Sequence, residues 1–186
     1  MTNTVGAGLI GAIIGAAATL IVGHWTSTDA HEEEARNHRG QSYSAFLKAE
    51  DSLSEHIQNN LLTRCQDQPD GRGRSPQTYA EVSTYYGLRL EVQRSLEVLR
   101  IYATEEGLKM ATSIYEITHP YEPFVYDGKT YARPPTDNPA TGETWGVTWN
   151  ISCTTAAGRM HTYSELRASM LGLMRCEISP TKPEDC

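Results

Sequence analysis

The feature of this sequence that most constrains its fold is an uncharged, apolar run near the N-terminus. Between Val5 and Val22 there is no charged side chain, and Thr19 carries the one hydroxyl group. As a helix, the stretch from residue 4 to residue 25 would be about 33 Å long at ~1.5 Å per residue, enough to cross a hydrocarbon core of ~30 Å. We therefore predict a transmembrane anchor over residues 1–25.

Two other interpretations of this run stay open: a cleaved secretory signal and a buried helix of a soluble domain. A signal peptide begins with basic residues and has a shorter apolar core. Residues 1–4 contain no Lys or Arg, which favours an anchor that the mature protein keeps.

Small residues recur at every fourth position of the run: Ala7, Gly11, Gly15, Thr19 and Gly23. Such a row lets two membrane helices approach closely and gain van der Waals contact. Glycine and alanine are also frequent in membrane helices in general, which would explain the row by composition alone. We predict a helix-packing face and a homo-oligomer formed through the span.

The rest of the chain, about 155 residues, is long enough for one domain with its own hydrophobic core. The whole chain is acidic, with a net charge of −7, and its basic residues are scattered. Nucleic-acid binding needs clustered Lys and Arg. We therefore expect membrane lipid and proteins as partners, and no nucleic acid.

Apolar residues at helical spacing predict two long helices after the anchor. The first runs from Asp29 to Cys65, before the breaker-rich loop QDQPDGRGRS. The second begins at Ser75-Pro76, an N-cap followed by proline, and continues for roughly 42 residues to His119-Pro120, with Gly87 and Gly107 as candidate positions for a kink. Its heptad-like apolar spacing is typical of a coiled coil.

A third helix is predicted over residues 156–178, before Ser179-Pro180 and a short tail, residues 179–186. Amphipathic helices joined by turns bury their apolar faces most simply in an antiparallel bundle. The predicted fold class is therefore mainly α: an N-terminal transmembrane helix and an antiparallel three-helix bundle over residues 26–178.

An aromatic insert, residues 120–153, interrupts the helical pattern. FVYDGKTY has Asp127-Gly128 between alternating residues, which signals a two-residue β-hairpin, and WGVTWNIS predicts a third strand. Its aromatic side chains either cap the bundle from inside or form a partner-binding surface, since Trp and Tyr dominate interface hot spots. The candidate partner surface comprises Tyr121, Phe124, Tyr126, Tyr131, Trp145 and Trp149.

A further pattern joins the two ends of the chain. Its residues are Trp25, Arg36, Arg39, Tyr43, Phe46 and Leu47, together with LRASMLGLMR at 166–175. This layout resembles a loose group of uncharacterised actinobacterial and actinophage single-pass membrane proteins, which have a Gly/Ala-rich span, a Trp, an Arg-containing stretch and an AYxxFL-like helix start. The chain departs from the group at Glu32-Glu33-Glu34, where basic residues are usual, and in the aromatic insert. The resemblance implies a membrane-anchored helical domain and no activity.

No catalytic or cofactor-binding constellation is evident, so we predict neither an enzyme nor a cofactor. His31, Glu34 and His38 share a helical face at a spacing that suits a metal ion. A solvated helix face explains the same residues without a metal, and this is the interpretation we favour.

Four cysteines, Cys65, Cys153, Cys176 and Cys186, fit neither a zinc-ligand spacing nor a CxxC motif. An oxidising compartment would permit two disulfides by any of three pairings, and a reducing one would keep free thiols. Cys65 and Cys176 end helices that run in the same direction in the three-helix bundle, so they are one candidate pair. His161 beside Cys153 or Cys176 would permit a Cys–His nucleophile pair, but no oxyanion-forming loop accompanies it.

Lys and Arg beside a membrane span set its orientation. None precedes the apolar run, whereas Arg36 and Arg39 follow it within the ~15–20 residues that count. This predicts an outside N-terminus in the plasma (inner) membrane and a cytoplasmic domain with free thiols.

Together these features predict a membrane-anchored, non-enzymatic interaction or scaffold module that self-associates through its span and docks an unidentified protein partner. The alternative, from a different class, is a phage- or prophage-encoded envelope effector acting in lysis or superinfection exclusion. A small, acidic, single-span helical chain suits both hypotheses.

Overall fold

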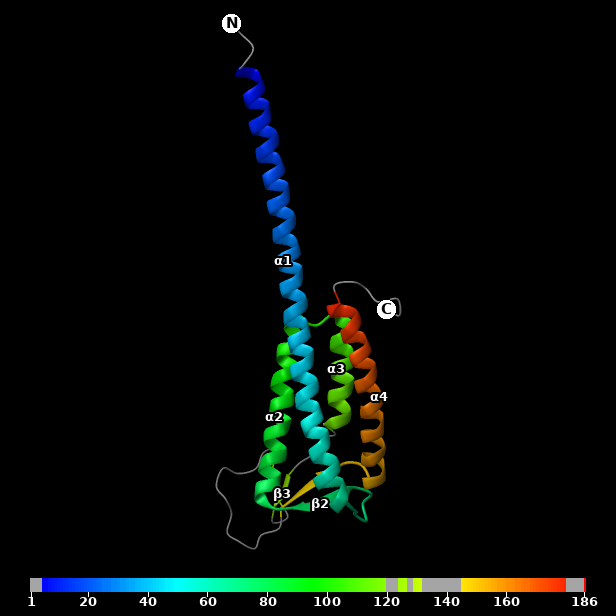
Figure 1. The fold of residues 1–186 in the computed structure, drawn as a ribbon. Coiled ribbons are helices and arrows are strands. Elements are labelled where there is room, and N and C mark those ends of the chain that lie inside the picture. Colours follow the sequence, from blue (N-terminus) through cyan, green and yellow to red (C-terminus); the bar gives the residue numbers. More distant parts are fainter. Residues whose placement is uncertain (1–4, 120–123, 127–128, 132–144, 180–185) are drawn as a thin grey trace.

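The computed structural model describes residues 5–119, 124–126, 129–131, 145–179 and 186, with side chains for 30–119, 145–179 and 186. Within this part the architecture is mainly α: four helices with a small antiparallel sheet at one end (Figure 1). The prediction of a mainly α fold with a β-insert is confirmed at this level.

The described part of the chain contains no helix that combines the length and the apolar character needed to cross a membrane. The predicted span, residues 1–25, and its row Ala7, Gly11, Gly15, Thr19 and Gly23 lie outside the residues whose side chains are described. Both stay predictions.

The helices are α1 (Val5–His56), α2 (Tyr79–Tyr102), α3 (Glu105–Thr118) and α4 (Cys153–Ile178). Successive helices run in opposite directions, so the ends of α2 and α4 lie at one end of the bundle and the sheet lies at the other (Figure 1). α1 leads into a π turn, Ile57–Leu61, and a 3-10 turn, Leu62–Arg64.

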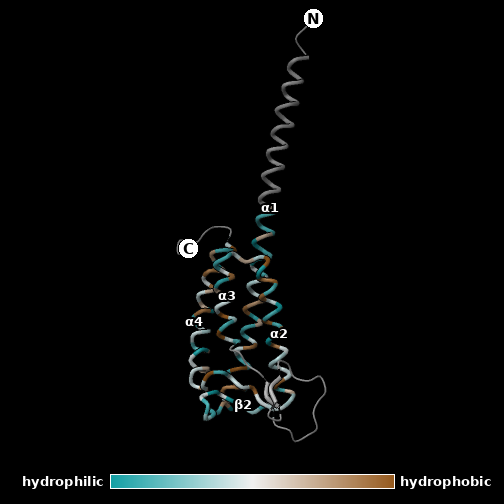
Figure 2. Tube along the Cα trace, turned by 180° about the vertical axis from the view of Figure 1, so that it is seen from behind, coloured by the Kyte–Doolittle hydropathy of each residue, from teal (hydrophilic) through white to brown (hydrophobic). Residues whose placement is uncertain are grey.

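α1 packs against each of the three other helices. Apolar and polar residues alternate along the described helices (Figure 2). The predicted stripe, Phe46 and Leu53 on α1 with Ile57 and Leu61 in the π turn, is buried throughout, because a helix with neighbours on several sides hides a broad apolar face. The stripe is therefore confirmed.

The long second helix of the sequence prediction is wrong, because the chain breaks at Ala103 and Thr104. Ala103 has an extended backbone, and the Thr104 hydroxyl accepts a hydrogen bond from Gly107 N at 3.1 Å, which caps a new helix. Glu105 and Glu106 then occupy its first turn, where the helix dipole favours acidic residues. The three-helix bundle is therefore a four-helix bundle.

The predicted start of the second helix at Ser75-Pro76 is also wrong. Thr78 is the N-cap of α2, and its side chain and that of Glu81 cap each other's backbone N–H groups in a capping box. Ser75 and Pro76 belong to a strand instead. The capping-box spacing was present in the sequence and marks the helix start more reliably than serine before proline.

The sheet has the strand order β1-β2-β5-β3-β4, with antiparallel neighbours. Its strands are β1 (Gln66–Asp67), β2 (Gly73–Gln77), β3 (Phe124–Tyr126), β4 (Lys129–Tyr131) and β5 (Trp145–Trp149). Tyr126 pairs with Lys129, as the predicted two-residue hairpin requires, and β5 is the predicted third strand. The pairing of β2 with β5 was not predicted.

Two disulfides join the cysteines: Cys65 to Cys153, with 5.8 Å between their Cα atoms, and Cys176 to Cys186, with 5.6 Å. The expected free thiols and the candidate 65–176 pair are therefore wrong for this structure. The reason for the changed pairing is the extra helix α3, which reverses α4. The first residue of α4, Cys153, therefore lies beside Cys65, which follows the 3-10 turn after α1. In the predicted three-helix bundle the last turn of that helix would lie there instead.

A polar clamp at the opposite end joins α1, α3 and α4 through the Glu177 carboxylate. This group accepts hydrogen bonds from the Tyr43 hydroxyl at 2.6 Å and from the Thr104 hydroxyl. Burial, together with the hydrogen bond to Glu177, raises the pKa of Tyr43 to about 12. Gly107 makes room for this contact, because a Cβ atom there would overlap the Tyr43 hydroxyl.

We predict that Gly107→Ala destabilises the fold by ~1–3 kcal/mol, because the added methyl group displaces Tyr43 from Glu177. Gly87→Ala is the matched control: Gly87 is an exposed residue of α2 with no atom near its absent Cβ. It should stabilise the protein by about 0.5–1 kcal/mol. Denaturant unfolding measures both, and equal effects would contradict the clamp.

Candidate functional site

The candidate partner surface is only partly described. Trp145 and Trp149 are each 1 % exposed, and the Trp145 ring packs edge-on against that of Tyr79 with 5.4 Å between ring centroids. These two residues therefore belong to the core, because β5 lies between β2 and β3 and all five of its residues are buried. Their place on a partner surface is corrected to an internal cap of the bundle.

The other members of that surface stay untested. The structure describes only the backbone of β3 and β4, which contain Phe124, Tyr126 and Tyr131. Tyr121 lies outside the described residues.

The candidate metal and nucleophile groups do not assemble in the described part of the chain. Glu34 and His38 form an exposed pair at 3.7 Å, and the His38 ring stacks on Tyr102. Among the described residues no three His, Cys, Asp or Glu side chains lie together as metal ligands would. Cys153 is in a disulfide, and the exposed His161 lies beside Glu165.

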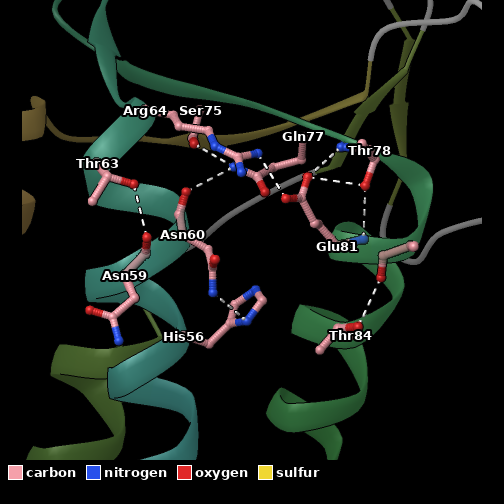
Figure 3. Close-up of polar contacts among 11 residues, drawn as sticks. His56, Asn59, Asn60, Thr63, Arg64, Ser75, Gln77, Thr78, Glu81 and Thr84 are labelled. Atoms are coloured by element: carbon pink, nitrogen blue, oxygen red, sulfur yellow. Dashed lines mark hydrogen bonds and ion pairs between the residues drawn. The ribbon is translucent and has the colours of Figure 1, made fainter.

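A polar network connects the end of α1 with β2 and the start of α2 (Figure 3). Arg64 forms an ion pair with Glu81 at 2.8 Å, and Glu81 also accepts hydrogen bonds from the backbone N–H of Thr78 at 2.8 Å and from its hydroxyl at 3.0 Å. Burial alone would raise the pKa of Glu81, but the bonds from Thr78 and Arg64 hold that pKa below its usual value. Glu81 is therefore an ionised structural anchor.

The π turn places its polar groups in the same network. Gln77 donates to the carbonyl oxygen of Asn60 at 3.2 Å and to the Ser75 hydroxyl at 2.8 Å, which ties β2 to the π turn. Asn60 contacts His56 Nδ1 at 3.2 Å, and burial lowers the pKa of His56 despite the nearby Glu81. Although π turns often mark functional sites, this one serves to dock the sheet.

A second cluster lies between α1 and α4. Asp51 accepts hydrogen bonds from the Tyr163 hydroxyl and from Arg167 Nη2, each at 2.7 Å. Burial would raise the pKa of Asp51, but the bonds from Arg167 and Tyr163 outweigh it and lower that pKa. Burial and the Asp51 carboxylate raise the pKa of Tyr163. This cluster is an ion pair that holds α4 against α1.

Glu50 precedes Asp51 of this cluster in the chain. It is fully buried, and among the described residues neither carboxyl oxygen makes a hydrogen bond of good geometry, although the Thr118 hydroxyl lies near enough to act on it. Burial raises its pKa to about 8, against a smaller lowering by the Thr118 hydroxyl. Glu50 therefore binds a proton more readily than a solvated glutamate does.

Sequence reasoning missed Glu50, although a signal was present. Glu50 lies four residues after Phe46 and three before Leu53, so it falls on the apolar face of the predicted helix. An acidic residue on such a face is either paired or neutral. Only the structure distinguishes Glu50 from its neighbour Asp51, which has partners on α4.

One apolar patch is exposed in the described part of the chain, at the last turn of α2. Its residues are Val98, Ile101 and Tyr102, of which Ile101 is 73 % exposed. Tyr102 also contacts α1 through His38, and its carbonyl oxygen accepts a hydrogen bond from Arg39 Nε at 3.1 Å.

Comparison of the chain with protein-family models, with curated proteins and with solved structures gave no match. The resemblance to actinobacterial and actinophage membrane proteins stays a prediction.

Proposed function

We propose that this chain is a membrane-tethered, non-enzymatic scaffold that self-associates through its N-terminal segment and holds a rigid helical domain outside the cytoplasm. The observation that carries the proposal is the pair of disulfides, Cys65–Cys153 and Cys176–Cys186, one at each end of the bundle. Disulfides persist in oxidising compartments and are rare in the cytosol.

The use of the polar groups supports a scaffold. The network around Glu81, the Asp51–Arg167 pair and the clamp at Glu177 each join two or more elements of the fold. A catalytic site would instead direct a nucleophile, base or oxyanion donor towards a space that a substrate can enter. In each of these clusters the donors and acceptors form hydrogen bonds and ion pairs with one another.

The disulfides and the basic residues give opposite predictions for the orientation. Arg36 and Arg39 favour a cytoplasmic domain, but two arginines are a small bias. Two disulfides in one small domain are the stronger argument, and we therefore propose that the domain faces the oxidising side. The envelope-effector hypothesis shares this architecture, and no separate observation favours it.

Orientation is tested on the full chain in intact cells. After treatment with an impermeant reductant, a polyethylene-glycol maleimide that does not cross membranes should shift the mass of the chain, because its cysteines face outside. Lysed cells give the maximal shift, and a cytoplasmic thiol protein is the control for leakage. A shift seen only after lysis would place the domain inside and remove this part of the proposal.

Self-association is tested by Gly11→Leu combined with Gly15→Leu, which should reduce crosslinked dimer several-fold because bulky side chains separate the helices. Ala16→Leu combined with Ala17→Leu adds comparable bulk away from the row and should leave the dimer intact. Equal dimer yields for the two double variants would mean that the small-residue row does not form the interface.

A further inference from the structure

Glu50 has an environment that calls for an explanation. It lies near the C-terminal end of α1, among the buried residues Phe46, Leu47 and Leu53, and is itself 0 % exposed. An ionised carboxylate in such a place would lack the hydrogen bonds that offset its loss of hydration, which costs several kcal/mol or forces the group to stay neutral.

The hydroxyl groups near Glu50 have other hydrogen-bond acceptors. On α1, the Ser54 hydroxyl donates to the Asp51 carbonyl oxygen at 3.0 Å. On α3, the Thr118 hydroxyl lowers the pKa of Glu50 somewhat, but it also lies 3.2 Å from the carbonyl oxygen of Ile114 and 3.3 Å from that of Tyr115, which compete for its hydrogen. On α4, Tyr163 donates to the Asp51 carboxylate.

The charged groups nearby also leave Glu50 without a counter-ion. Arg167 of α4 forms its ion pair with Asp51, whose negative charge disfavours a second one on Glu50. The positive charge of Arg89 on α2 lowers the pKa of His119 and has no resolved effect on the pKa of Glu50. His119 itself is kept neutral by burial and by Arg89, which lower its pKa to about 3.

We infer that Glu50 is a proton-operated lock: its neutral form keeps α1, α3 and α4 closed, and loss of its proton opens the core around it to water. The ligand of this site is a proton. The inference goes beyond the scaffold function and depends on neither the membrane anchor nor the orientation of the domain.

The direction of the pH effect follows from linkage. Burial raises the pKa of Glu50 from 4.5 to about 8, so the closed state binds the proton more tightly than an open, hydrated state does. The stabilisation of the closed state is complete below the ordinary pKa and is lost as the pH rises to about 8. Between these values the opening equilibrium constant should rise about tenfold per pH unit, and then level off.

The experiment is amide hydrogen exchange of the full chain with its disulfides intact, from pH 5.5 to 9.5, after correction for the intrinsic exchange rate. For amides in residues 46–54 and 111–118, the opening constant should increase about tenfold per pH unit up to about pH 8 and be constant above it. In Glu50→Gln the same amides should show no such rise. Glu55→Gln removes an exposed acid of α1 and should behave as the wild type.

A direct titration of the wild type keeps the test independent of how the variants fold. The carboxyl carbon of Glu50, followed by NMR after selective labelling, should titrate with a midpoint near 8. A midpoint in the ordinary range of a solvated glutamate, or an unchanged pH dependence in a folded Glu50→Gln, would overturn the inference. Opening that does not depend on pH in the wild type would overturn it as well.

Discussion

Because α2 ends at Tyr102 and α3 begins at Glu105, the chain reverses once more than a continuous helix would allow. The Thr104 cap and the room that Gly107 leaves for Tyr43 stabilise this reversal. Every later element depends on it: α3 runs towards the sheet, the insert starts there, and α4 returns to the opposite end (Figure 1). The same reversal brings Cys153 to the 3-10 turn that follows α1, where it meets Cys65.

The sheet illustrates how local patterns and long-range contacts differ in what they reveal. The hairpin and β5 were predictable, because Asp127-Gly128 and the alternation in WGVTWNIS are local signals. β2 was not, because its Gly and Pro residues look like loop, and it becomes a strand through its pairing with β5. The burial of Trp145 and Trp149 follows from the same pairing, so their role could not be decided from composition.

For the polar residues, too, local spacing was predictable and long-range partners were not. The apolar stripe of α1 was read correctly from helical spacing, whereas the adjacent acids Glu50 and Asp51 differ only through what α4 supplies to them. Arg167 and Tyr163 come from a helix whose direction the sequence prediction had reversed. The predicted disulfide pairing was wrong for the same reason, because four cysteines allow three connectivities and only the order of the helices selects one. The burial of Glu50 and the pairing of the cysteines are thus both consequences of how the helices are ordered.

The four-helix order is tested most directly by mapping the disulfides of the purified, unreduced chain by proteolysis and mass spectrometry. We expect one peptide pair that joins Cys65 to Cys153 and another that joins Cys176 to Cys186. A Cys65–Cys176 link would mean that α4 runs in the same direction as α1. That result would contradict the reversal at Thr104 and the account built on it.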